Sequence, residues 1–143
     1  MSVLDASVIL KWFVDEEDSV QALRIRDEFY NGNREIIVPD LLLFEVSNAL
    51  RYNPSFTVEE IKEAMRTIFD VGVEIITPTY SLLASAIELA KKLDVTCYDA
   101  VYLALAADLD FDFITADEKF YRKVNKGMEP KTIVRLLSSL YED

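Results

Sequence analysis

Short apolar runs alternate along this chain with longer segments in which apolar residues recur at helical spacing. Val3–Leu4, Ile36–Val38 and Val73–Ile76 are brief and rich in β-branched residues, which predicts buried strands. Asp112–Thr115 is expected as a fourth strand and Thr132–Val134 as a fifth. The segments between them predict helices over residues 6–13, 19–30, 41–52, 57–70, 80–93, 96–106 and 117–124.

The order of these elements predicts the fold class. Strands alternate with helices and lack hairpin turn residues, so we expect βαβ units and a central parallel sheet of about five strands, covered on both faces. Neither an internal repeat nor a linker divides the sequence. Residues 1–143 are therefore expected to form one three-layer α/β/α domain.

The apolar spacing also predicts which helix faces point inward. In the helix over 80–93, the expected core face carries Leu83, Ile87, Ala90 and Leu93. The helix over 96–106 is apolar almost all round, so we expect it to be buried. Asp40 is expected to cap one helix, and Thr57 with Glu60 forms a capping box for the next.

The composition favours a folded protein in a reducing compartment. The chain is 51% hydrophobic with only 3 Gly and 4 Pro, which argues against disorder. It has neither an apolar run long enough to cross a membrane nor a basic leader with a cleavage site. Its single cysteine, Cys97, cannot form an internal disulfide, so a cytoplasmic location is the simplest interpretation.

Two features of the composition restrict the chemistry. The chain contains no histidine, which excludes His-based triads, histidine general bases and ordinary zinc sites. Its formal net charge of -11 argues against a large sequence-independent surface for nucleic acid. The same acidity is what a carboxylate-lined Mg²⁺ or Mn²⁺ site helps to produce.

Two acidic residues follow predicted strands. Asp5 comes after the first strand and Asp117 after the fourth, at the sheet edge where open α/β folds bind ligands. Each has a simpler interpretation as a helix cap, with Thr115 as another candidate for the cap of the last helix. Taken alone, either position is explained by capping.

Two more acids lie in apolar helices. Glu45 is surrounded by apolar residues, and a buried carboxylate requires a cation or hydrogen bonds. Asp99 is explained equally by a capping box with Thr96 or by a functional role, because bulky residues surround it.

Taken together, the four acids indicate a metal site more strongly than any one of them does alone. Four carboxylates at one crevice repel each other unless one or two divalent cations neutralise them, and oxygen-only ligands favour Mg²⁺ or Mn²⁺. Such a site suits phosphodiester hydrolysis, which then needs neither histidine nor a protein nucleophile. Ser7 is a nearby hydrogen-bonding partner for Asp5.

Four motifs in this order resemble the PIN-domain family, most closely the small single-domain VapC-type toxins of toxin–antitoxin pairs. The match rests on the segments around the four acids, at residues 3–7, 43–50, 96–106 and 114–120. It covers essentially the whole chain, and the segment around Asp99 is the most specific.

The resemblance implies a five-stranded parallel sheet and an Mg²⁺- or Mn²⁺-dependent endoribonuclease, the toxin of a type II toxin–antitoxin pair. It implies that the metal-binding and catalytic residues are Asp5, Glu45, Asp99 and Asp117, because they match the family's four acidic positions. Ser7 and Thr115 match its polar supporting positions. The resemblance also implies an RNA substrate, a homodimer and an antitoxin protein that covers the site.

Basic and aromatic side chains supply candidates for RNA binding. Basic residues concentrate after Asp117, so we expect phosphate contacts from Lys119, Arg122 and Lys123, unless these form an ordinary solvated surface. Lys126, Lys131 and Arg135 continue this stretch, and Lys11 and Arg51 follow motif acids closely. Trp12, Phe13 and Tyr52 are candidates for base stacking, although packing explains them better.

Other functions are compatible with parts of this pattern. One alternative is a PIN fold that serves only to bind a partner, against which the intact acids count. A receiver-like domain that binds Mg²⁺ through Asp5 is a weaker alternative, because it requires a pair of acids after the first strand. A phosphatase of the Asp-x-Asp type is disfavoured, since Ser7 occupies its second acidic position.

Overall fold

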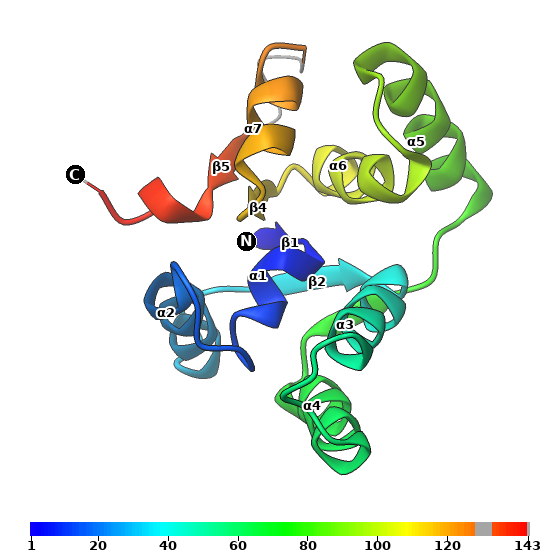
Figure 1. Ribbon diagram of the computed structural model, residues 1–143. Helices are drawn as coiled ribbons and strands as arrows, with labels where there is room; N and C mark the ends of the chain where they lie inside the picture. The colour runs from blue at the N-terminus through cyan, green and yellow to red at the C-terminus, as the bar shows by residue number, and fades with distance from the viewer. Residues whose placement is uncertain (128–132, 143) are drawn as a thin grey trace.

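In the computed structural model, which describes residues 1–127 and 133–142, strands and helices alternate as the apolar pattern predicts (Figure 1). The strands are β1 (Ser2–Leu4), β2 (Ile36–Pro39), β3 (Glu74–Ile76), β4 (Asp112–Thr115) and β5 (Val134–Leu136). The helices are α1 (Ala6–Leu10), α2 (Ser19–Tyr30), α3 (Leu41–Arg51), α4 (Val58–Val71), α5 (Tyr80–Leu93), α6 (Cys97–Leu109) and α7 (Glu118–Asn125), and a short 3₁₀ turn, η1 (Leu137–Ser139), follows β5.

The strands form a parallel sheet in the order β3-β2-β1-β4-β5. In Figure 1, α5, α6 and α7 lie on one face of this sheet, and α1 to α4 lie on the other. Helix α6 contacts β1, β2 and β4, and α7 contacts β5. The predicted three-layer α/β/α architecture with a five-stranded parallel sheet is therefore confirmed.

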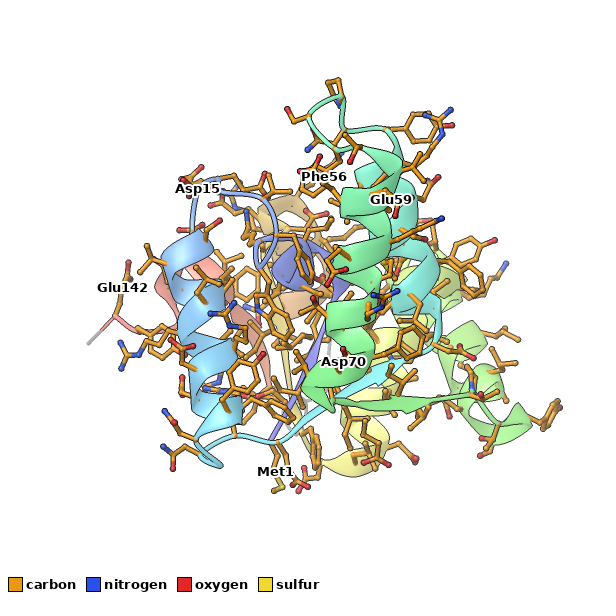
Figure 2. All side chains as sticks on the ribbon, turned by 90° about the horizontal axis from the view of Figure 1, so that it is seen from below. Met1, Asp15, Phe56, Glu59, Asp70 and Glu142 are labelled. Carbon is orange, nitrogen blue, oxygen red and sulfur yellow. The ribbon has the colours of Figure 1, made fainter. Side chains whose placement is uncertain are left out.

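The direction of the strands gives the molecule two distinct ends. Figure 2 shows Met1 and Asp70 towards one end, and Asp15, Phe56 and Glu59 at the opposite end. Because the strands are parallel and β1 begins next to Met1, their carboxyl ends face the end marked by Asp15. Ligand sites of open parallel sheets lie at this edge.

Some predicted boundaries are wrong. Helix α1 ends at Leu10 rather than Phe13, and the Trp12 side chain turns inward to donate a hydrogen bond from Nε1 to the Ala22 carbonyl at 2.9 Å. Asp40 occupies the N-cap position of α3 without a side-chain capping bond. The last strand begins at Val134, two residues later than predicted, and Thr132 of that prediction lies outside the described residues.

Helix α6 forms the centre of the core, and residues 100–106 are buried as predicted. The predicted inner face of α5 is half wrong, because Leu83 and Ile87 are 42% and 54% exposed. The buried positions of α5 are Leu82, Ala86, Ala90 and Leu93. Two of them are alanines, and α5 contacts α6. None of the described helices is long and apolar enough to cross a membrane.

The C-terminal segment is fastened to α2, beside which Figure 2 shows Glu142. The Tyr141 hydroxyl donates a hydrogen bond to the Glu28 carboxylate, and the Arg24 guanidinium lies 3.8 Å from the centre of the Tyr141 ring. Arg34 bridges Glu28 and the Ser2 hydroxyl at 3.3 and 2.6 Å. This polar network holds β1, α2 and the C-terminal segment together, at the end of β1 away from Asp5.

Candidate active site

Asp5 lies at the junction of β1 and α1, where residues of α1 and of the neighbouring strand β4 fix its carboxylate. It caps α1, because Oδ1 accepts hydrogen bonds from the Ser7 backbone N–H at 3.0 Å and from the Ser7 hydroxyl. The Thr115 hydroxyl, at the end of β4, donates to Oδ2 at 2.5 Å. The Ala116 backbone N–H donates in turn to Ser7 Oγ at 3.0 Å. Asp5 therefore caps α1, and this role is compatible with a functional role for the same carboxylate.

The surroundings of Asp5 favour its neutral form. Although the residue keeps some exposed surface, its carboxylate is enclosed by protein, and this burial raises the pKa of Asp5 from 3.8 to about 6. Hydrogen bonds from Ser7 and Thr115 stabilise the carboxylate and act in the opposite direction on the pKa. Asp5 is thus held rigidly in a place where a cation would make its ionised form more favourable.

Glu45, on α3, is half-buried and faces α6. The Tyr102 hydroxyl of α6 donates a hydrogen bond to Glu45 Oε1 at 2.5 Å. Burial raises the pKa of Glu45, the negative charge of Asp99 raises it further, and the Tyr102 hydrogen bond lowers it. Sequence reasoning missed Tyr102, because 57 residues separate it from Glu45 and only tertiary packing brings the two together.

Asp99 and Asp117 lie at the N-terminal ends of α6 and α7. The Asp99 backbone N–H donates to Thr96 Oγ1 at 3.1 Å, and Asp117 itself caps α7 by accepting from the Phe120 N–H at 2.9 Å. The pKa of Asp99 is raised by burial and by the charge of Asp117. The structure therefore brings these two acids close enough to repel one another.

Two cavities meet at Asp99. The larger, of about 790 Å³, lies between α3 and the start of α6 and includes Glu45 and Arg51 in its wall. The smaller, of about 440 Å³, lies between the start of α6 and α7 and includes Asp117. Both are lined by Thr96 and Asp99. Three of the four predicted acids thus border two adjoining cavities at the expected edge of the sheet.

The four acids are oxygen donors, the ligand type that Mg²⁺ and Mn²⁺ prefer. Among the described residues, none of the four carboxylates forms an ion pair with a lysine or an arginine. Within the same residues, no three acidic or cysteine side chains are arranged as a ready-made ion site. Raised pKa values and repulsion between neighbouring acids are what unneutralised ligands show, and oxygen donors suit Mg²⁺ or Mn²⁺.

The predicted RNA-binding residues fall into two groups. Lys119 and Lys123 line the smaller cavity, and Arg51 lines the larger one. Lys11 is paired with Glu16 at 3.1 Å and Arg122 with Glu118 at 2.9 Å, and neither borders these cavities. Further along the stretch, Arg135 is paired with Asp112 at 3.0 Å, near the start of β4, and Lys131 lies outside the described residues.

Sequence reasoning also singled out different aromatic residues from those beside the site. Trp12 is buried, whereas Phe44 and Tyr98 are exposed and line the larger cavity. A simple pattern in the sequence could have found them, because each directly precedes a candidate acid, Glu45 or Asp99.

Comparisons with known proteins agree with the fold. A family model described as PIN domain matches residues 2–126. A curated relative, Ribonuclease VapC3 of Pyrobaculum aerophilum, is 30% identical over 125 residues, which are 85% of this chain and 92% of the relative.

Solved structures share the fold at lower identity. VapC20 of Mycobacterium tuberculosis, described as a sarcin-ricin loop cleaving toxin, is 15% identical with a TM-score of 0.69, over 85% of this chain and 94% of that one. VapBC2 of Rickettsia felis, bound to a DNA fragment from its promoter, is 15% identical with a TM-score of 0.67, over 93% and 96%. A toxin–antitoxin complex from Klebsiella pneumoniae is 16% identical with a TM-score of 0.67, over 93% and 100%.

Proposed function

This chain belongs to the PIN-domain family, and from that premise we propose that it is an endoribonuclease that cleaves RNA phosphodiester bonds with Mg²⁺ or Mn²⁺. We take residues 1–143 as a single domain and the chain as the toxin of a type II toxin–antitoxin pair. Its likeness to Ribonuclease VapC3 and to chains of toxin–antitoxin complexes supports this role.

One observation carries the proposal. Carboxylates at the carboxyl edge of the parallel sheet lie close enough to repel each other. Among the described residues they have no lysine or arginine partner, and they border cavities large enough for a nucleotide. A folded protein keeps such an arrangement at a cost in stability, so it points to a ligand of positive charge.

In the proposed site, Asp5, Glu45, Asp99 and Asp117 hold the cation. A bound Mg²⁺ or Mn²⁺ supplies an activated water molecule and neutralises charge on the phosphate in the transition state. The protein contributes orientation, because Ser7 and Thr115 fix both oxygens of Asp5 and Tyr102 fixes Glu45. These three are positioning residues, since they act through the carboxylates.

The basic residues at the cavities hold the RNA backbone. Lys119 and Lys123 line one of the two cavities that share Asp99 and Arg51 lines the other, so basic side chains border both cavities. Phosphates on either side of the cleaved bond are thereby attracted towards the site. A cognate antitoxin that covers these cavities, a homodimeric assembly and a cytoplasmic location complete the proposal.

The direct experiment is cleavage of a labelled single-stranded RNA by the purified protein without antitoxin. We expect cleavage with Mg²⁺ or Mn²⁺, none with chelator, and a loss of at least 100-fold in Asp5→Asn and Asp99→Asn. Wild-type protein that binds RNA and metal but cleaves nothing would favour the non-catalytic PIN module. Failure to bind a divalent metal would refute the proposed role of the four acids.

A further inference from the structure

One face of α3, turned away from its most buried residues, forms a wall of the larger cavity. Its residues recur every three or four positions and are Leu41, Phe44, Asn48 and Arg51. The core-facing residues of the same helix, Leu42, Val46 and Leu50, are buried. The cavity face of α3 therefore combines the apolar Leu41 and Phe44 with the polar Asn48 and Arg51, and Phe44 is exposed on it.

Exposed aromatic side chains lie at this cavity. Phe44 is 72% exposed and Tyr98 is 66% exposed, and they come from α3 and α6 on the two sides of the cavity. Each precedes a candidate metal ligand, Glu45 or Asp99, which line the same cavity. Whatever fills the cavity therefore lies directly beside the proposed cleavage site.

We propose that this cavity holds one unpaired base of the RNA, stacked on Phe44 and Tyr98, next to the phosphodiester bond that is cut. The inference rests on the proposed ribonuclease function. The chemistry of the wall favours a base, because a base is neutral and tolerates the carboxylates of Glu45 and Asp99, whereas its flat face stacks on aromatic rings. Asn48 offers an amide donor and acceptor to the edge of a base, and Arg51 offers a positive charge to the adjoining phosphate.

The two cavities then divide the nucleotide between them. The aromatic cavity receives the base, and the smaller cavity with Lys119 and Lys123 receives the backbone beyond Asp99. A base can enter the aromatic cavity only if it is free of pairing and of its neighbours in the stack. The proposal therefore requires that the base beside the cleaved bond be unpaired and unstacked in the bound RNA.

The test compares RNAs that lack a single base. A cleavage site is first mapped with wild-type protein on an unstructured RNA. Oligonucleotides are then made with one abasic ribose at each position around that site. Cleavage is measured as kcat/KM, and binding is measured with Ca²⁺ in place of Mg²⁺. The variants are Phe44→Ala, Tyr98→Ala and the conservative Tyr98→Phe. Tyr80→Ala is the control, since this exposed tyrosine lies on α5 and does not line the cavity.

We expect one abasic position to weaken binding and cleavage by wild-type protein by roughly 5- to 150-fold, the range for one stacked base. At that position the loss should shrink to less than about 3-fold in Phe44→Ala and Tyr98→Ala, and persist in Tyr98→Phe and Tyr80→Ala. Unchanged melting temperatures would show that the variants fold.

If the abasic ribose reduced binding and cleavage equally in wild type and in both alanine variants, the inference would be overturned while the ribonuclease function stayed intact. Variants that alter only self-association, with RNA binding unchanged, would also overturn it and would assign the cavity to a second copy of the chain. If wild type cleaved no RNA, the proposed function would fail. The Ca²⁺ binding data, on RNAs with an abasic ribose at successive positions, would then decide the base site separately.

Discussion

The Tyr102 hydroxyl donates a hydrogen bond to Glu45 Oε1 at 2.5 Å and so connects α6 with α3. This contact fixes one candidate ligand from the most deeply buried helix of the fold, because Tyr102 is only 2% exposed. A carboxylate that is oriented by a buried phenol loses both its partner and its orientation when the hydroxyl is removed.

Tyr102→Phe tests the importance of that orientation. We expect the free energy of unfolding to fall by about 1.5–3 kcal/mol, since a hydrogen bond to a charged group is lost and the acceptor stays half-buried. Because the hydroxyl lowers the pKa of Glu45, the acidic limb of the activity profile should shift to higher pH. Urea unfolding and a pH–rate profile measure the two effects. A stability loss without any shift of the profile would mean that Tyr102 has a purely structural role.

Glu45→Gln separates the charge of Glu45 from its shape. The glutamine amide oxygen can still accept the Tyr102 hydrogen bond, so we expect a folded protein that is equally or more stable without metal. Activity should be lost. If the metal-free variant were markedly destabilised instead, removing the repulsion between Glu45 and Asp99 would have brought no benefit, and the result would argue against a ligand role for Glu45.

Asp5 makes the stability of the metal-free protein depend on pH. Its folded-state pKa of about 6 exceeds the ordinary aspartate pKa of 3.8, so the folded form binds the proton more tightly than the unfolded form does. The stabilisation from this proton is complete below pH 3.8 and is lost as the pH rises through about 6. The free energy of unfolding of Asp5→Asn should therefore exceed that of wild type by about 1–3 kcal/mol at pH 7. At pH 4 the two free energies should be nearly equal.

The matched measurement is urea unfolding with chelator at both pH values, with the exposed Asp15→Asn as the control. A benefit of Asp5→Asn that is equal at pH 4 and pH 7 would contradict the proposed origin. Added Mn²⁺ should raise the melting temperature of wild type at pH 7 by mass action, and should do so far less in Asp5→Asn.

Lys123→Ala tests the proposed backbone contact in the smaller cavity. We expect KM for RNA to rise by about 3- to 10-fold with little change in kcat, and the slope of log affinity against log salt to fall by about 0.7. Lys62→Ala is a matched control, because both lysines lie 3.6 Å from one acidic partner and only Lys123 borders the site. Equal effects of the two substitutions would mean that only overall charge matters.

Features that depend on local sequence were predictable. The strand Asp112–Thr115 and the helix Ser19–Tyr30 have the predicted bounds, because turn residues and apolar spacing mark both ends. The capping box of Thr57 and Glu60 is confirmed, since capping depends on residues three positions apart. Asp5 was likewise placed correctly after β1.

Features that depend on packing between distant elements were not predictable. The buried face of α5 uses Ala86 and Ala90, which contribute little to an apolar pattern, and Leu83 and Ile87 misled the prediction. The link from Tyr102 to Glu45 and the cavity beside Phe44 depend on where α3 and α6 meet. The sequence identifies the acids but carries no record of their partners across the fold.

The neighbouring positions of β1 and β4 have a consequence for synthesis of the chain. Asp5 precedes Thr115, which fixes its carboxylate, by 110 residues in the sequence, and Asp117 is made later still. A growing chain on the ribosome therefore carries an unassembled site until β4 has emerged and paired with β1.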